Sequence, residues 1–257
     1  MSSLIDKSTL FSLRNDASCE ILNDLNIDDS LKNKVIEVPD LGMFFPHQLK
    51  RKTELKRGLF QPAVNGGFDI ITNRYRTAEN YRKILNFVKK NNLKYFHHID
   101  KDWGVEVVLK MLEEPHRHIE HIADVAELEE SSAFTYDIFK NIVKTTNYPK
   151  AIEHYFRHDF SVGLRGHGQI IPVAINLPSL YLSTQPKVYN FAAKNDLLDF
   201  TIDINEAGWH EDLLFKFDKL KNDKEYLNLW YEKRDIAATN ANASILKFMK
   251  KIKQELG

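Results

Sequence analysis

The alternation of strand-like and helix-like segments constrains the fold of this chain more than any other feature. Short apolar segments alternate with segments of about 10 to 15 residues whose apolar side chains recur at helical spacing. Parallel strands need a crossover of this length, which is nearly always right-handed, so the pattern predicts βαβ units and a parallel sheet. The expected strands lie at 9–13, 35–38, 68–72, 94–99, 118–125, 159–165, 178–183 and 200–204, and the expected helices at 20–25, 77–88, 102–112, 134–144, 170–175, 186–194, 209–220 and about 225–255.

One basic segment divides the chain. Gln48 to Arg57 carries five lysine and arginine residues, ends at Gly58 and is flanked by Pro46 and Pro62. We interpret it as a solvated linker, with a phosphate- or sugar-contacting loop as the alternative. The strand, helix and strand before it are too few to close a sheet of their own. The predicted organisation is therefore a short βαβ unit at 1–46, a basic linker at 47–60 and a parallel-sheet domain with closing helices at 61–257.

Charge and cysteine content exclude several classes of protein. The chain has 36 basic residues (lysine and arginine) and 36 acidic residues (aspartate and glutamate). This neutral balance argues against a nucleic-acid binder or a polybasic membrane anchor. The single cysteine, Cys19, cannot form an internal disulfide, which indicates a reducing compartment. No apolar run approaches the roughly 18 to 20 residues that span a bilayer, and Met1 to Asp6 lacks the features of a signal peptide. We expect a cytoplasmic protein, or one that touches the inner face of the membrane through a partner or substrate.

The segment with the clearest chemical potential follows the expected strand at 159–165. Arg165 and His167 stand where this strand ends, and Gly166 and Gly168 leave the backbone around them uncovered. The helix that follows presents free N–H groups and the positive end of its dipole. A guanidinium, an imidazole and a helix N-terminus together suit a phosphate or a carboxylate. The alternative is that the glycines only serve a tight turn, in which His167 is a structural residue.

The next expected strand ends in a similar loop. Ser183, Thr184 and Gln185 supply hydroxyls and an amide, and Lys187 lies in the first turn of the helix that follows. A lysine at that position is unfavourable to the helix dipole unless an anion lies opposite. Since ligands bind at the shared carboxyl edge of parallel strands, both loops are candidates for one anion site. A solvent-facing lysine is the alternative.

Two further groups of residues are weaker candidates. The histidines between Glu113 and His121 match no structural zinc spacing, so we predict no metal site there. Arg74, His98 and Asp100 follow other expected strands, where each has either a role at the ligand edge or a surface and packing role.

These patterns resemble those of a known family. Arg165-Gly166-His167-Gly168, an apolar helix, a strand, a polar loop and then Pro186-Lys187-Val188 resemble the polysaccharide pyruvyl transferase family, whose usual form is Arg-Leu-His-Gly/Ala. Near the front, Ser12 to Ser18 resembles the family's arginine, acidic residue and serine at a helix start, and Val38-Pro39-Asp40 resembles its proline-aspartate. The resemblance runs over about 11–204 and is specific in these patches.

The resemblance implies two Rossmann-like domains that face each other across a cleft, as in GT-B glycosyltransferases. On this chain it implies an α/β protein whose Rossmann-like parallel-sheet domain resembles the C-terminal half of a GT-B fold, with the N-terminal βαβ unit as a remnant of the other half. The implied activity is transfer of a pyruvyl group from phosphoenolpyruvate onto a sugar of a surface polysaccharide as a ketal. No cofactor or metal is implied. Phosphoenolpyruvate is the donor substrate, and the acceptor is a saccharide, free or lipid-linked.

The same resemblance assigns roles to individual residues. Arg165 and His167 are expected to hold the donor as the catalytic pair, with Lys187 nearby and Arg14 facing them. The reaction needs protonation of the methylene carbon, attack of a sugar oxygen on C2, and displacement of phosphate by a second hydroxyl. His167 can donate the proton or bind the phosphate as an imidazolium, and both roles stay open. The expected substrate-binding residues are Arg14, Arg165, His167, Gly168, Ser183 and Lys187.

The chain also departs from the family pattern. It has Gly166 where leucine is usual and Asn15 where aspartate is common. Family members are usually longer, mostly before the motif at Arg14, so a truncated or divergent member is implied. Its acceptor-binding half is then missing, supplied by a second copy or a partner chain, or lost with the activity. The alternatives are a sugar-nucleotide-dependent, GT-B-like glycosyltransferase and a non-catalytic binding or assembly module. We also expect the amphipathic C-terminal helix to cross back to the reduced first domain.

Overall fold

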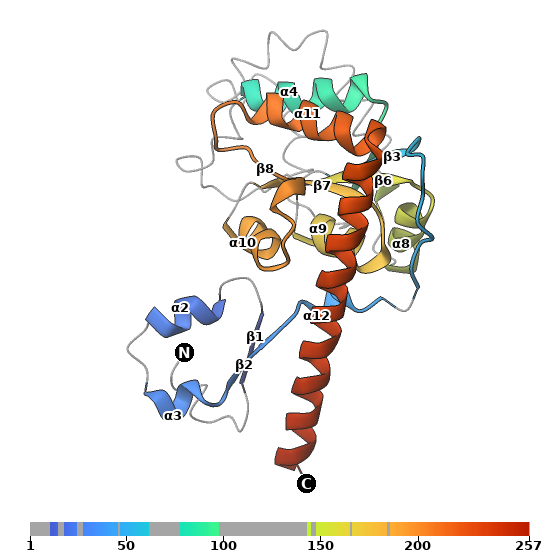
Figure 1. The fold of residues 1–257 in the computed structure, drawn as a ribbon. Coiled ribbons are helices and arrows are strands. Elements are labelled where there is room, and N and C mark those ends of the chain that lie inside the picture. Colours follow the sequence, from blue (N-terminus) through green and yellow to red (C-terminus); the bar gives the residue numbers. More distant parts are fainter. Residues whose placement is uncertain are drawn as a thin grey trace.

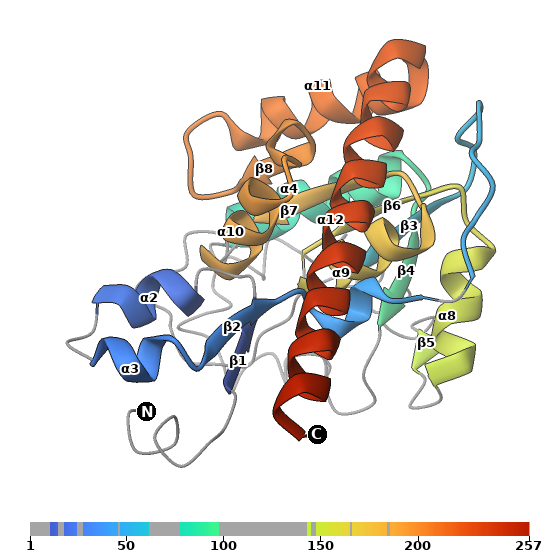
Figure 2. The same ribbon diagram turned by 60° about the horizontal axis from the view of Figure 1, so that its bottom comes forward.

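All strands that the structure describes belong to two parallel sheets, one of two strands and one of six (Figures 1 and 2). The structure is a computed structural model. In the part of the chain that it describes, no helix combines the length and apolar character needed to cross a membrane. The described residues are 11–14, 18–24, 28–45, 47–61, 78–97, 143–144, 148–164, 166–183 and 186–256.

The smaller sheet is built by the N-terminal residues. Its strands, β1 (Phe11–Arg14) and β2 (Val35–Val38), pair in parallel, with Phe11 opposite Val35. The connection between them contains the short helices α2 (Ser18–Asp24) and α3 (Asp29–Lys32). This arrangement confirms the predicted N-terminal βαβ unit.

The larger sheet has six parallel strands. They are β3 (Gly58–Gln61), β4 (Lys94–His97), β5 (Val143–Lys144), β6 (Phe160–Gly163), β7 (Ser179–Ser183) and β8 (Thr201–Asp203). Their order across the sheet is β5-β4-β3-β6-β7-β8. The chain therefore builds outward from β3 in one direction through β4 and β5, and outward from β6 in the other through β7 and β8. This arrangement confirms the predicted α/β class with a Rossmann-like parallel sheet. The direction in which successive strands are added to the sheet reverses between β3 and β6.

Helices cover both faces of this sheet, as Figure 1 shows. On one face, Phe217 packs edge-on against Phe87 and Phe160, with ring centroids 4.9 and 5.6 Å apart. On the other face, Tyr155 and Leu59 belong to a second buried cluster. Strands covered on both faces are buried along their whole length, and all four residues of β6 are buried, including Ser161, whose hydroxyl is hydrogen-bonded to that of Ser179. The first face carries α4 (Ala78–Lys90) and α11 (Trp209–Asn222), and the second carries α8 (Tyr148–Phe156), α9 (Gly166–Ile175) and α10 (Pro186–Lys194).

The last helix, α12 (Lys224–Leu256), runs from the large sheet back to the small one (Figures 1 and 2). In this helix, the Ser244 hydroxyl donates a hydrogen bond to the carbonyl of Glu37 in β2 at 3.3 Å, and the Lys251 ammonium donates one to the carbonyl of Asn33 at 3.4 Å. Closer to the large sheet, the buried guanidinium of Arg234 donates to two carbonyls of α9. These contacts confirm the predicted crossing.

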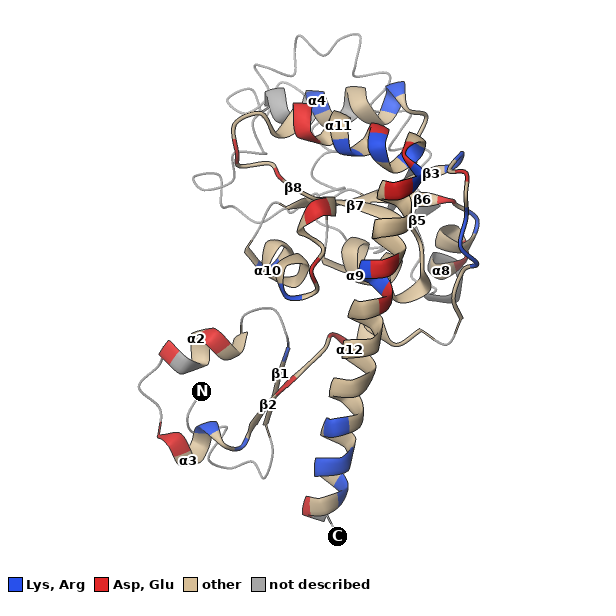
Figure 3. Cartoon of the chain, viewed as in Figure 1, with Lys and Arg blue, Asp and Glu red and all other residues tan. Residues whose placement is uncertain are grey.

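Opposite charges also join the N-terminal unit to the rest of the chain. The aspartate and glutamate residues of this unit are coloured red on the ribbon in Figure 3. Lys194, at the end of α10, lies 2.8 Å from Glu20 of α2 and 2.7 Å from Glu37 of β2. Because a sheet of two strands is marginal on its own, these contacts and α12 are what hold it in place.

Several predicted elements differ from the structure or lie outside the described residues. The helix predicted over 134–144 is wrong at its end, because Val143 and Lys144 form β5. The helix α8 and the strand β3 were not predicted, and β3 begins at Gly58, inside the predicted linker. A strand of four residues next to a run of charges has too short an apolar pattern to be recognised locally. The elements predicted at 68–72, 102–112 and 118–125 lie outside the described residues.

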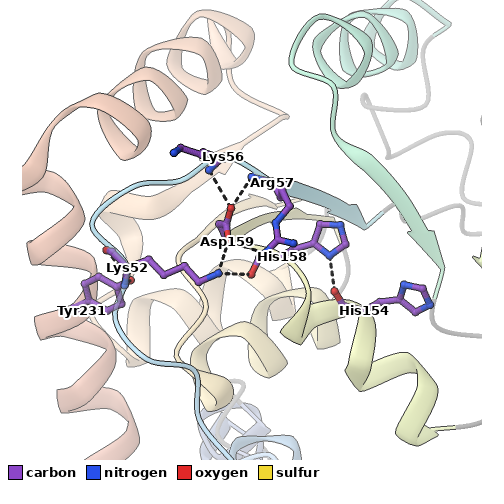
Figure 4. Close-up of polar contacts among 7 residues, drawn as sticks. All are labelled: Lys52, Lys56, Arg57, His154, His158, Asp159 and Tyr231. Atoms are coloured by element: carbon purple, nitrogen blue, oxygen red, sulfur yellow. Dashed lines mark hydrogen bonds and ion pairs between the residues drawn. The ribbon is translucent and has the colours of Figure 1, made fainter.

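One buried carboxylate anchors the basic segment (Figure 4). Asp159, the residue before β6, pairs with the Lys52 ammonium and accepts hydrogen bonds from the backbone N–H groups of Lys56 and Arg57, at 3.1 and 2.8 Å. The backbone N–H of Lys52 donates to the Tyr231 hydroxyl on α12 at 2.8 Å. The segment that we interpreted as a solvated linker is therefore fastened to the sheet and to α12, although the Lys56 side chain stays exposed.

These contacts shift the titration of Asp159. Burial raises the pKa of this carboxyl, but the hydrogen bond from Lys52, the backbone N–H groups of Arg57 and Lys56, and the Lys52 charge outweigh burial and lower the pKa to about 2. The pKa of an aspartate in an unfolded chain is about 3.9. The interaction therefore stabilises the fold above about pH 4, and this stabilisation is lost as the pH falls from about 4 toward 2.

Asp159→Asn is expected to lower the free energy of unfolding at pH 7 by about 2 kcal/mol, because one pKa unit corresponds to about 1.4 kcal/mol. Urea unfolding measures this difference, which should shrink below about pH 4. Glu54→Gln is the matched control, since Glu54 pairs with Lys56 in the same segment but both side chains are exposed. We expect it to leave stability unchanged. An Asp159→Asn chain as stable as wild type would contradict the anchoring role.

Candidate functional site

The candidate site lies at the carboxyl edge of the large sheet, between β3 and β6. Gln61 and Gly163, the last residues of these strands, are register partners. In open α/β sheets, ligands bind outside the carboxyl ends of the strands where the strand order reverses. This reversal lies between β3 and β6, so the topology places the turn from β6 into α9 at the binding edge.

The first turn of α9 carries the predicted histidine. This helix begins at Gly166, earlier than the predicted start at Ile170, so that His167 and Gly168 both lie in its first turn. The His167 side chain is exposed, and no described residue forms a hydrogen bond or ion pair with it. Backbone N–H groups at the start of a helix have no partner within the helix, and they favour an anion. An exposed imidazole therefore stands beside an anion-suited helix end.

Close packing between α9 and the strand ends requires two glycines. A Cβ atom on Gly163 would lie 2.7 Å from the carbonyl oxygen of Gly168. A Cβ atom on Gly168 would lie 1.5 Å from Oε1 of Gln61, whereas one on Gly166 would meet no atom within 4 Å. The structure therefore places Gly168, which we predicted to bind substrate, in a buried packing position under the glutamine side chain.

The N-terminal unit brings an ion pair to the same place. Asp40 follows β2 and caps the short helix η1 (Leu41–Met43), accepting a hydrogen bond from Gly42 N at 2.8 Å. Its other oxygen accepts one from Arg14 Nη1 at 3.0 Å. A Cβ atom on Gly42 would lie 3.1 Å from Asp40 Oδ1 and 3.9 Å from His167 Cδ2. The carboxyl ends of both sheets therefore meet at the first turn of α9, with Arg14 and Asp40 opposite His167.

The remaining predicted residues are distributed around this edge. Lys187 is exposed in the first turn of α10, which begins at Pro186 as predicted. Because β6 and β7 are neighbours and α9 and α10 follow their carboxyl ends, Lys187 and His167 lie at the same edge. No contact in the described part of the chain joins these two side chains. Ser183, at the end of β7, is only 2% exposed, and Arg165 lies outside the described residues.

Sequence reasoning missed two polar residues at this edge. Gln61 ends β3, and Gln169 follows Gly168 in α9. Their side chains are 1% and 0% exposed, and neither amide has a hydrogen-bond partner at its nitrogen or its oxygen. The sequence did contain a signal for these residues: one glutamine follows the apolar Leu59–Phe60 pair, and the other precedes the apolar run of a helix, and both positions are expected to be buried.

Among the described residues, none of the other candidates belongs to this site. Within the residues that the structure describes, no group of three or more histidine, cysteine, aspartate or glutamate side chains could hold a metal ion. The histidines between Glu113 and His121, and likewise Arg74, His98 and Asp100, lie outside those residues. Burial, together with the nearby Glu37 carboxylate, raises the pKa of the Cys19 thiol to about 11, so this cysteine is a neutral thiol near neutral pH.

The fold and this edge define an α/β protein in which a Rossmann-like parallel sheet of six strands and a small two-stranded parallel unit meet around a helix N-terminus. The family model for polysaccharide pyruvyl transferase matches residues 1–186, and the chain belongs to this family. A solved structure described as the crystal structure of accessory secretory protein 1, 2 and 3 in Streptococcus pneumoniae is similar, with a TM-score of 0.51 and 12% identity. The match covers 99% of this chain and 44% of that one, and at this identity it shows the fold alone. No curated protein matches the chain.

Gly163→Ala is expected to lower the free energy of unfolding by about 1–3 kcal/mol, because the added methyl group would push the first turn of α9 away from β6. Gly166→Ala is the matched control, since its methyl group enters open space in a helical turn and should leave stability unchanged or slightly higher. Chemical denaturation compares the two. Equal stability of both variants would show that the strand and helix are not closely constrained.

Proposed function

We propose that this chain is a pyruvyl transferase, which moves the pyruvyl group of phosphoenolpyruvate onto two hydroxyls of a polysaccharide sugar. Family membership supports a transferase. The observation that carries the proposal is the position of His167, exposed in the first turn of α9 at the reversal point of the sheet. Phosphoenolpyruvate carries a carboxylate and a phosphate, and the free N–H groups of a helix end beside cationic side chains suit both.

The proposed reaction needs one proton transfer and two attacks at C2. A proton is added to the methylene carbon, which becomes the methyl group, and a sugar hydroxyl oxygen attacks C2 and loses its own proton. A second hydroxyl oxygen then attacks C2 and loses its proton, while the bond from C2 to the phosphate oxygen breaks. One hydroxyl proton replaces the proton used at the methylene carbon, and the other leaves with the phosphate or to water. The products are a cyclic ketal and inorganic phosphate.

The residues of the site can support each step. His167 donates the proton or, as an imidazolium, binds the phosphate. Lys187 and Arg165 are the cations proposed to neutralise the leaving phosphate. Asp40 holds Arg14 by an ion pair of 3.0 Å, and the Arg14 side chain is 43% exposed. Ser183 is not assigned a direct contact because it is buried and, unlike the amides of Gln61 and Gln169, already has an interaction partner.

We also propose that further residues complete the acceptor side of the site. In the described residues the N-terminal sheet has only two strands, β1 and β2, whereas a polysaccharide sugar needs a surface with several hydroxyl-binding groups. A second copy or a partner chain would supply them. The proposed reaction takes place in the cytoplasm, and at the inner face of the membrane where the acceptor is lipid-linked.

Phosphoenolpyruvate is expected to raise the Tm of the wild-type chain, and His167→Ala and Lys187→Ala should each weaken its binding by about tenfold, because each removes a charge-assisted contact. Thermal shift and calorimetry measure both effects. Lys253→Ala is the control, since this exposed lysine lies at the far end of α12.

The pattern of ligands distinguishes the alternatives. Phosphate release should require phosphoenolpyruvate and a saccharide acceptor together. Stabilisation by nucleoside diphosphates in place of phosphoenolpyruvate would instead indicate a sugar-nucleotide glycosyltransferase. Stabilisation by none of these compounds would reject the transferase in favour of a binding module.

A further inference from the structure

We propose that the side-chain amides of Gln61 and Gln169 line the base of the anion site, where their Nε2 groups donate hydrogen bonds to an oxyanion of the bound donor. We call this pair of uncharged amides the amide floor. This inference rests on the proposed function and adds to it two residues that position the ligand. The class of ligand is a small carboxylate or phosphate, which phosphoenolpyruvate combines in one molecule.

The location of both amides supports this role. Gln61 is the last residue of β3, at the strand pair where the sheet reverses, and its Oε1 lies against Gly168 in the first turn of α9. Gln169 belongs to the same turn, two residues after His167. Gln61 therefore ends a strand at the position where the topology places a ligand, and Gln169 lies in the first turn of the helix that begins there.

The unpaired state of these amides is the second observation. In the described part of the chain, Gln61 and Gln169 are the side-chain amides in which both nitrogen and oxygen are buried without a hydrogen-bond partner. Buried polar groups are nearly always paired, and a buried group without a partner destabilises the fold. Two such groups at one sheet edge indicate that their partner is a ligand.

Packing alone does not explain glutamine at either position. The other three residues of β3 are buried, and so are the residues of α9 from Ile170 to Ile175, all of which are apolar. Leucine or methionine would fill a similar volume without burying an unpaired amide. Gln61 is long and unbranched, and rotation of its side chain would turn the amide toward the sheet edge without moving the strand.

A neutral donor suits this position physically. A buried cation without a bound anion would be far more destabilising than a buried amide. An amide can donate hydrogen bonds to an oxyanion in a site that water does not reach, where such bonds are strong. The exposed cation Lys187 then supplies charge, while the two amides supply directional contacts.

The test compares Gln61→Met and Gln169→Met with wild type, and uses phosphoenolpyruvate, inorganic phosphate and pyruvate as ligands in calorimetry and thermal shift. We expect each variant to have a Tm without ligand equal to or above that of wild type, because the unpaired amide is gone. We expect each to bind phosphoenolpyruvate at least about tenfold more weakly. Gln48→Met is the matched control: the same substitution at an exposed glutamine outside this edge should leave binding unchanged.

Comparing the three ligands shows which group of phosphoenolpyruvate the amides contact. Weaker binding of phosphate with unchanged binding of pyruvate would place the amides at the phosphate group, and the reverse would place them at the carboxylate; either result supports the floor. If a methionine variant fails to fold, Gln61→Leu and Gln169→Leu also remove the amide at a similar volume, so each should weaken anion binding by about tenfold while circular dichroism stays as in wild type.

Two results would overturn the inference, and they differ in what else they reject. Wild-type affinity for phosphoenolpyruvate in both methionine variants would reject the amide floor and leave the proposed function standing. A wild-type chain that binds none of the three anions would reject the proposed function and the floor together.

Discussion

The carboxylate of Asp159 holds the basic segment that connects the N-terminal unit to the large sheet. By pairing with Lys52 and accepting the backbone N–H groups of Lys56 and Arg57, it fastens the basic segment to the start of β6. The segment then leads directly into β3, so β3 and β6 are joined at their amino ends through this contact. With the segment held, η1 rests on α9, and the Arg14–Asp40 pair comes to lie opposite His167. A single buried charge thereby links the orientation of one sheet to the geometry at the edge of the other.

The opposite ends of β3 and β6 carry the edge at which we propose that a ligand binds. Gly163 and Gly168 allow α9 to approach the sheet as closely as backbone atoms permit, and Gln61 lies over that contact with its amide unpaired. Active sites commonly retain arrangements that destabilise the free protein because a ligand completes them. Asp159, at the amino end of β6, is paired, whereas the amides near the carboxyl ends of β3 and β6 are unpaired. This contrast agrees with the rule that ligands bind at the carboxyl ends of parallel strands.

Family membership and fold answer different questions about this chain. The family model covers residues 1–186, which include both motif regions, and it establishes a relation to polysaccharide pyruvyl transferases. The similar solved structure shows that the same two-sheet plan can belong to a protein described as an accessory secretory protein. Since one fold hosts many activities, the function has to be argued from the edge around His167.

The sequence by itself determined the features that depend on neighbouring residues. Apolar periodicity and glycine and proline positions predicted the parallel α/β sheet, the strands around β6 and β7, the helices α10 to α12, and the placing of His167 and Lys187 after strands. Only the tertiary structure decided that Arg14 pairs with Asp40, that the basic segment is anchored by Asp159, and that Gln61 lies over Gly168. These contacts join residues 26 or more positions apart, and no local pattern records them. They arise because folding brings the ends of separate strands to a common edge.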